Sequence, residues 1–228
     1  MTMPSLCKQV VCFDLDDTLY KECSYLKSAF QEIAAYINRH CGVSKETVYS
    51  EMISAWNEGK SPFQEICARH EINMTVEQCL QIYREHKPAI HLDDETSYTL
   101  KALHANGCTL GLITDGRSIT QRNKIEALGL HAFFQEEHII ISEEFGSAKP
   151  SERNFSYFME LYPHARFAYI GDNLKKDFIT PNKLGWKTIC LLDNGDNIHK
   201  QDFHLPEEYL SKFQVRDIRE VIEIIIKN

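Results

Sequence analysis

The sequence lacks the patterns that mark several large classes of protein. Its eight cysteines include no C-x-x-C pair and its ten histidines no H-x-x-x-H pair, so no zinc-ligand spacing is present. No apolar run approaches the length of a membrane span, and the start, MTMPSLCKQV, contains no apolar signal-peptide segment. No internal repeat or low-complexity segment is found. We therefore expect a cytoplasmic protein with no zinc site and no membrane partner.

Positive charge is also scarce. The chain has 25 lysines and arginines against 33 aspartates and glutamates, a formal net charge of −8. This balance argues against a general nucleic-acid partner, and an anionic ligand would need a local cation. With 228 residues and 43% hydrophobic content, the chain has room for one large domain or for one domain with a smaller insertion. These patterns do not indicate the oligomeric state.

What the sequence does contain is a series of short apolar runs typical of buried strands. The runs are continuous rather than alternating, as in a parallel sheet covered on both faces, and span residues 9–13, 108–113, 138–141, 167–170 and 187–192. Helical patterns are found at residues 94–105, 118–128, 151–162 and 215–227. The alternation predicts a doubly wound α/β core around a parallel sheet of five strands or slightly more.

One interval is too long for a single crossover helix. More than ninety residues separate the first predicted strand from the second, and apolar residues recur there at helical spacing, as at Leu26, Phe30, Ile33 and Ile37. We therefore predict an inserted helical domain over residues 21–91. The α/β core would then comprise residues 1–20 and 92–228.

Polar side chains follow the predicted strands at the points where the strands end. They are Asp14, Asp16, Asp17 and Thr18 after the first, Thr114, Asp115 and Gly116 after the second, Lys149 beyond the third, and Asp172, Asn173 and Asp177 after the fourth. In open α/β sheets this edge binds ligands. Carboxylates gathered there resist joint ionisation unless a cation is present. Hard oxygen ligands without histidine or cysteine favour Mg²⁺.

This set of residues suits phosphoryl transfer. An aspartate beside Mg²⁺, with hydrogen-bond donors opposite, can attack phosphorus and form an aspartyl phosphate. Thr114 and the backbone N–H groups of Asp115 and Gly116 would receive phosphate oxygens at a strand-to-helix turn. Lys149 supplies a second positive charge.

The same residues resemble a known family. DLDDT (residues 14–18), LITDG (112–116), KP (149–150) and GDNLKKD (171–177) resemble, in order, the four signature motifs of the haloacid dehalogenase superfamily. The inserted helices resemble the α-helical cap of its subfamily I, in the phosphoglycolate phosphatase-like branch. The resemblance implies a Rossmann-like core and phosphatase activity.

By that resemblance, Asp14 is the nucleophile, and Asp16 protonates the leaving alcohol and then activates water. Asp14, the backbone carbonyl of Asp16, and Asp172 would hold Mg²⁺. Thr114 and Lys149 would stabilise the transferring phosphoryl group. An acid at position 16 favours ester hydrolysis over dehalogenation, since a halide leaving group needs no proton.

The remaining motif residues are assigned supporting roles. Asp177, with Asn173, would lie behind the ligands and orient Lys149 or a water on the metal. The Asp115 side chain is expected to point away from the phosphate, so that only its N–H is used. Asp17 and Thr18 are interpreted as shaping the turn.

Three functions are compatible with these residues. The first is a Mg²⁺-dependent phosphatase acting on a small soluble phosphate monoester such as a sugar phosphate, a nucleoside monophosphate or phosphoglycolate. The second is a phosphomutase of the same superfamily, which passes the phosphoryl group to a sugar. The third is a receiver-like phospho-acceptor domain, although receivers lack a long insertion after the first strand.

Overall fold

The computed structural model describes residues 8–70 and 74–227 of the chain. The predictions that rest on residues 1–7, including the absence of a signal segment and the first part of the core, lie outside these ranges. No helix within the two ranges is both long and apolar enough to cross a membrane.

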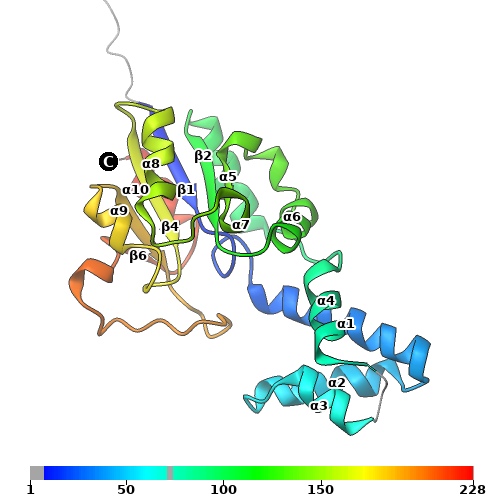
Figure 1. Cartoon of the computed structure of the whole chain (residues 1–228). Coiled ribbons are helices and arrows are strands. Elements are labelled where there is room, and N and C mark those ends of the chain that lie inside the picture. Colours follow the sequence, from blue (N-terminus) through cyan, green and yellow to red (C-terminus); the bar gives the residue numbers. More distant parts are fainter. Residues whose placement is uncertain (1–7, 71–73, 228) are drawn as a thin grey trace, which may run out of the picture.

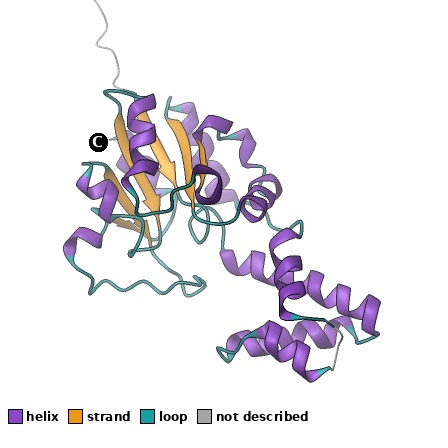
Figure 2. Ribbon diagram, viewed as in Figure 1, coloured by secondary structure: helices purple, strands orange, loops and turns teal. Residues whose placement is uncertain are grey.

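A parallel sheet forms the centre of the larger part of the molecule (Figures 1 and 2). Among the described residues its strand order is β3-β2-β1-β4-β5-β6. The strands are β1 (Gln9–Phe13), β2 (Thr109–Thr114), β3 (Ile139–Ile141), β4 (Arg166–Gly171), β5 (Lys187–Leu191) and β6 (Phe213–Val215). The predicted doubly wound α/β class is confirmed, because every pairing in the sheet is parallel and the order reverses beside β1.

Helices cover both faces of the sheet. In β1, Val11 and Phe13 face one apolar cluster, whereas Val10 and Cys12 face another. The first cluster includes residues of α5 (Asp94–Ala105), α6 (Ser118–Ala127) and α10 (Glu220–Ile226), and the second includes those of α8 (Glu152–Leu161). The short helices α7 (Ser142–Phe145) and α9 (Ile179–Lys183) lie in the connections. Burial on both faces explains why the strands read as continuous apolar runs.

Four helices between β1 and α5 pack chiefly among themselves, apart from the sheet (Figure 1). They are α1 (Glu22–Cys41), α2 (Lys45–Asn57), α3 (Pro62–Arg69) and α4 (Val76–Glu85). Their cluster contains the predicted stripe on α1, including Phe30, Ile33 and Ile37. The Asp17 carboxylate accepts a hydrogen bond from the Glu22 N–H at 2.9 Å, so the acidic turn itself begins α1. The chain therefore leaves the sheet edge directly into these helices.

The end of the chain differs from the sequence-based expectation. A single helix over residues 215–227 was predicted, but Val215 belongs to β6 and α10 begins only at Glu220. Val215 pairs with Leu191 of β5, and its side chain is buried against the same apolar cluster as α10. Pairing with the sheet thus overrides a helical spacing that Val215 shares with Ile218 and Ile222.

Candidate active site

The site lies at the carboxyl edge of the central strands. Asp14 follows β1, Thr114 ends β2, and Asp172 follows β4. The Asp14 N–H donates to the Ile170 carbonyl at 2.8 Å, which extends the β1–β4 pairing by one residue. Because β1 lies between β2 and β4, the parallel sheet brings these strand ends together.

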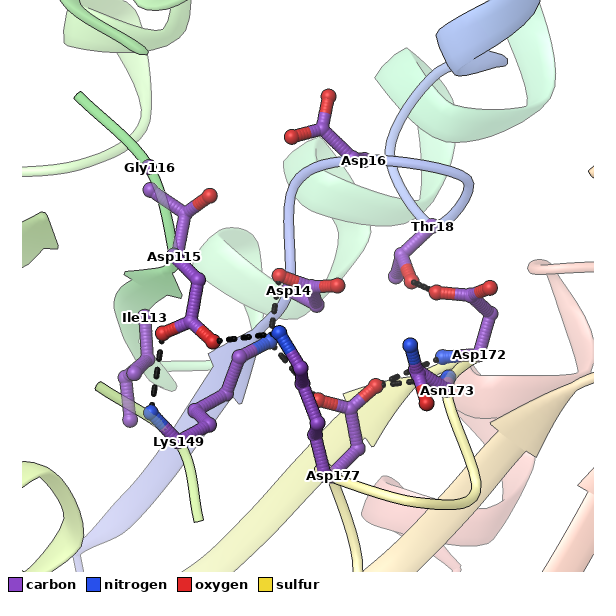
Figure 3. A network of polar contacts seen from close by, with 12 residues as sticks. Asp14, Asp16, Thr18, Ile113, Asp115, Gly116, Lys149, Asp172, Asn173 and Asp177 are labelled. Atoms are coloured by element: carbon purple, nitrogen blue, oxygen red, sulfur yellow. Dashed lines mark hydrogen bonds and ion pairs between the residues drawn. The ribbon is translucent and has the colours of Figure 1, made fainter. Parts of the chain in front are cut away.

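Three buried carboxylates lie within reach of one another (Figure 3). One oxygen from each of Asp14, Asp172 and Asp177 lies within 4.8 Å of the others. The Lys149 ammonium is 2.7 Å from Asp14 Oδ1 and 2.8 Å from Asp177 Oδ1, and it donates to the Tyr169 hydroxyl at 3.0 Å. Lys149 is therefore a single buried cation in a cluster of three buried carboxylates.

Asp177 is already fully engaged. Its Oδ1 contacts Lys149, and its Oδ2 accepts the backbone N–H groups of Asp172 at 3.2 Å and Asn173 at 2.8 Å. Gly171 permits this arrangement, because any side chain there would collide with the Asp177 carboxylate. Asp177 thus holds the β4 turn and Lys149 in place, and Asp14 and Asp172 have oxygens left for a cation.

The electrostatics of the cluster fit a missing positive charge. Burial raises the pKa of Asp14 to about 7, with Asp177 adding to the effect and Lys149 opposing it. Burial, followed by the negative charges of Asp14 and Asp177, raises the pKa of Asp172 to about 9. Lys149 is itself buried, which disfavours its ammonium, yet Asp14 and Asp177 keep its pKa well above the ordinary value. A divalent cation beside Asp14 and Asp172 would balance the remaining charge, so the cluster can bind a metal.

In the absence of divalent metal, we expect stability to fall as the pH rises from about 4 to about 9. Burial raises the pKa of Asp14 to about 7 and that of Asp172 to about 9, against an ordinary 3.8, so these two carboxyls hold more protons in the folded chain than in the unfolded chain in this window. Their contribution to stability therefore decreases as the pH rises. Thermal unfolding in chelator at several pH values measures this, and added divalent cation should raise the unfolding temperature most at high pH.

Asp172→Asn is the matched control for this pH dependence. It removes the carboxylate with the higher of the two pKa values, so the fall in unfolding temperature above pH ~7 should become shallower than in wild type. An identical pH profile for the two proteins would contradict the assignment of this destabilisation to Asp172.

Asp16 lies at the same turn but its side chain is held away from the three carboxylates (Figure 3). It accepts hydrogen bonds from Lys124 Nζ at 2.7 Å, the Tyr20 hydroxyl at 2.5 Å and Gln121 Nε2 at 3.0 Å. Burial alone would raise the pKa of Asp16, but the Lys124 charge and these hydrogen bonds hold it below the ordinary value. In this arrangement Asp16 is an ionised carboxylate turned toward α6.

The residues that were predicted to bind phosphate already make hydrogen bonds within the protein. The Thr114 hydroxyl accepts a hydrogen bond from Gln121 Nε2 at 2.6 Å. The Asp115 carboxylate accepts the Lys149 N–H at 2.9 Å and lies 3.2 Å from Lys176 Nζ, so it is turned toward the Lys149 segment. The Gly116 N–H donates to the Ser142 hydroxyl at 2.9 Å, so its predicted phosphate contact would require that bond to open.

A cavity of about 130 Å³ opens in front of these groups. The predicted residues that line it are Asp14, Asp16, Thr114, Asp115, Lys149, Asp172 and Asn173, whereas Gly116 and Asp177 do not. Asp17, Glu22 of α1, Lys176 and His199 also line it. Burial, followed by the nearby Asp16 charge, raises the pKa of Glu22 to about 8. One wall of the cavity thus comes from the helices inserted after β1.

Several contacts of the site were not anticipated from the sequence. Lys124 and Gln121 hold Asp16 from α6, and Asn197, from the segment after β5, donates to Asp172. The one available signal was the spacing of Gln121 and Lys124, which places them on one helical face. Both are almost fully buried, and burial of polar helix residues cannot be read from spacing alone.

Comparison with known proteins now assigns the family. The haloacid dehalogenase-like hydrolase family matches residues 11–191, which is most of the chain. The chain belongs to this family. Its match includes all four strand-end motifs and the helices between β1 and β2.

Individual relatives agree with this assignment. The chain is 27% identical to the glyceraldehyde 3-phosphate phosphatase of Methanocaldococcus jannaschii, covering 94% of this chain and 96% of that protein. It is 29% identical to the pyrimidine 5'-nucleotidase YjjG of Escherichia coli, over 57% of this chain and 54% of that one. Among solved structures, magnesium-bound YfnB of Bacillus subtilis has a TM-score of 0.62 at 20% identity, covering 96% of this chain and 99% of YfnB, a likeness in fold.

Proposed function

We propose that this protein is a Mg²⁺-dependent phosphatase that hydrolyses a small phosphate monoester through an aspartyl phosphate on Asp14. The observation that supports this most directly is the buried Asp14 carboxylate, 2.7 Å from the Lys149 ammonium and in the same cluster as Asp172. A buried carboxylate with a cation on one side and a metal-binding partner on the other suits attack on phosphorus.

Lys149 and Thr114 would act on the transferring phosphoryl group. Both line the cavity beside Asp14, and Lys149 is held in position by Asp177 and Tyr169. A preorganised ammonium and hydroxyl there would stabilise the charge that spreads over the phosphoryl oxygens in the transition state. Asn173 and Asp177 support this arrangement from behind, through the hydrogen bonds of the β4 turn.

Asp16 would serve as the acid and then the base. Asp16 already forms part of the cavity wall, but its carboxylate is bound to Lys124. To act on the substrate, the carboxylate must leave Lys124 and turn toward the centre of the cavity. A protonated Asp16 could then give its proton to the leaving alcohol, and its carboxylate could take one from the attacking water. Because Lys124 favours the ionised form, this change of position would also favour protonation.

Mg²⁺ is the metal that we assign to the carboxylate cluster. Asp14 and Asp172 offer hard oxygens, and the Asp16 carbonyl is the third ligand that we propose. No histidine or cysteine contributes to the cluster among the described residues, which disfavours zinc and copper. When bound, the cation would draw the phosphate toward Asp14 and reduce its negative charge.

Residues 21–91 would form a cap over this site, and residues 8–20 and 92–227 the described part of the core. The helices α1–α4 bury their own apolar cluster, and Glu22 at the start of α1 lines the cavity. A cap in this place would exclude water and contact the leaving group. None of the described cysteines forms a disulfide, which is consistent with the reducing, cytoplasmic location that we propose.

Triose phosphates are the first substrates to test. The relatives named glyceraldehyde 3-phosphate phosphatase match 94–95% of this chain in the three strongest cases, whereas the pyrimidine 5'-nucleotidase matches 57%.

The proposal is tested by phosphate release from a panel of monoesters, including glyceraldehyde 3-phosphate, sugar phosphates, phosphoglycolate and nucleoside monophosphates. We expect turnover with Mg²⁺ and none after chelation. In ¹⁸O-labelled water, solvent oxygen should enter the released phosphate, because water resolves the aspartyl phosphate.

Other outcomes would favour the alternatives. Transfer of phosphate to a second sugar position without solvent oxygen would indicate a phosphomutase. A long-lived phosphoprotein without turnover would indicate a receiver-like domain. Absence of phosphate release from every monoester with Mg²⁺ would contradict the proposal.

A further inference from the structure

The segment between β5 and β6 runs along the edge of the site (Figure 1). It is fastened to that edge by Gln201, whose Nε2 donates to the Asp172 carbonyl at 2.9 Å and whose Oε1 accepts the Asp193 N–H at 3.0 Å. The Asp193 carboxylate in turn accepts the Asn197 N–H at 3.0 Å. These contacts give the segment a defined shape beside Asp172.

Asn197 links two groups of opposite charge. Its Nδ2 donates to Asp172 Oδ2 at 3.1 Å, and its Oδ1 accepts from Lys21 Nζ at 2.6 Å. Because an ammonium has only donors and the ionised carboxylate that would bind a metal has only acceptors, the amide can satisfy both partners in a single orientation. Lys21 immediately precedes α1, so the bridge runs from the start of the inserted helices to Asp172.

Asp172 has few other side-chain partners. The Thr18 hydroxyl is 3.4 Å from its Oδ1, near the limit of a hydrogen bond, and none of the described lysine, arginine or histidine side chains forms an ion pair with it. The Asn197 amide is thus the closer of its two side-chain donors. The neighbouring Ile198 is fixed independently, because its N–H donates to Asp17 Oδ2 at 2.8 Å.

We propose that Asn197 is a positioning residue that orients the Asp172 carboxylate for the metal, and that Lys21 holds the Asn197 amide in the required orientation. The proposal rests on the function proposed above, in which Asp172 is a metal ligand. Mg²⁺ demands near-ideal octahedral geometry, so a freely rotating carboxylate would bind it less well. Hydrogen-bond partners of metal ligands typically account for about 10–100-fold in metal affinity.

Removal of Lys21 distinguishes this proposal from an explanation based on charge alone. A positive charge close to the site repels a cation, so removal of Lys21 by charge alone would strengthen Mg²⁺ binding. If Lys21 acts by holding Asn197, its removal weakens Mg²⁺ binding instead. The two effects have opposite signs.

The test measures Mg²⁺ binding without substrate, by titrating magnesium chloride into chelator-stripped protein and following the unfolding temperature and the heat of binding. Wild type, Asn197→Ala, Lys21→Met and the double variant are compared. Asn194→Ala is the matched control, because Asn194 lies in the same segment and, among the described residues, its side chain accepts only the Asp196 N–H. Unfolding temperatures in chelator verify that each variant folds.

We expect a Mg²⁺ dissociation constant about 10–100-fold higher for Asn197→Ala, a smaller increase for Lys21→Met, and no change for Asn194→Ala. The double variant should resemble Asn197→Ala, because Lys21 acts through that residue.

Unchanged Mg²⁺ affinity in Asn197→Ala would overturn the proposed role of Asn197, but it would not contradict the proposed phosphatase function. Tighter binding in Lys21→Met would overturn the role of Lys21, and no Mg²⁺ binding by wild type would overturn both this proposal and the assignment of Mg²⁺.

Discussion

Asp14→Asn is expected to reduce phosphate release by roughly 10⁴–10⁶-fold, because an amide cannot attack phosphorus in place of the carboxylate. The substitution is nearly isosteric, and Lys149 keeps its contact with Asp177. Burial raises the pKa of Asp14 to about 7, so removal of this charge should not destabilise the metal-free protein above neutral pH. Single-turnover and steady-state phosphate release, together with unfolding temperature, measure the two effects.

The control for this substitution is Asp94→Asn, an exposed aspartate in the first turn of α5. It should retain wild-type phosphate release, since it lies away from the cavity. Activity of Asp14→Asn within about tenfold of wild type would exclude Asp14 as the nucleophile. Loss of its folded structure would instead show that Asp14 is needed for the architecture of the sheet edge.

Lys149→Met should be the most destabilising single change at the site. Lys149 is buried between Asp14 and Asp177, and its removal leaves both carboxylates without a cation. Removing one partner of a buried ion pair typically lowers the free energy of unfolding by about 3–5 kcal/mol. Under the proposed mechanism phosphate release should fall by roughly 10²–10³-fold as well, because the variant lacks the ammonium that we propose stabilises the transferring phosphoryl group. Urea unfolding and steady-state kinetics provide the measurements.

The loss of stability in Lys149→Met should depend on pH. Burial raises the pKa of Asp14 to about 7 even with Lys149 beside it, so Asp14 can be protonated at low pH, and the difference from wild type should be smaller near pH 5 than near pH 8. Lys176→Met is the matched control, since Lys176 pairs with Asp115 at 3.2 Å but its side chain is 49% exposed. Such a surface pair contributes about 0–1 kcal/mol. Equal urea midpoints for Lys149→Met and wild type would contradict the buried arrangement.

The α/β core could be predicted well because its signals are local. The β1 run was predicted with its observed bounds, and the α5 pattern matches Asp94–Ala105. Asp93 accepts the Thr96 N–H at 2.7 Å, and the turn at Asn106-Gly107 ends α5, so both ends of this helix are set by neighbouring residues. The β6 strand was missed because three residues at the sheet edge acquire their conformation from pairing with β5.

The candidate site could likewise be predicted only in part. The sequence by itself determined which polar residues follow which strands, and a parallel sheet must bring such ends to one edge, because all its strands point in the same direction. Only the tertiary structure decided how those side chains share their partners. It turns Asp16 toward Lys124, engages both oxygens of Asp177, and brings Asn197 between Asp172 and Lys21. Most of these contacts join residues far apart in the chain, so they depend on how helices and loops pack, which no local pattern encodes.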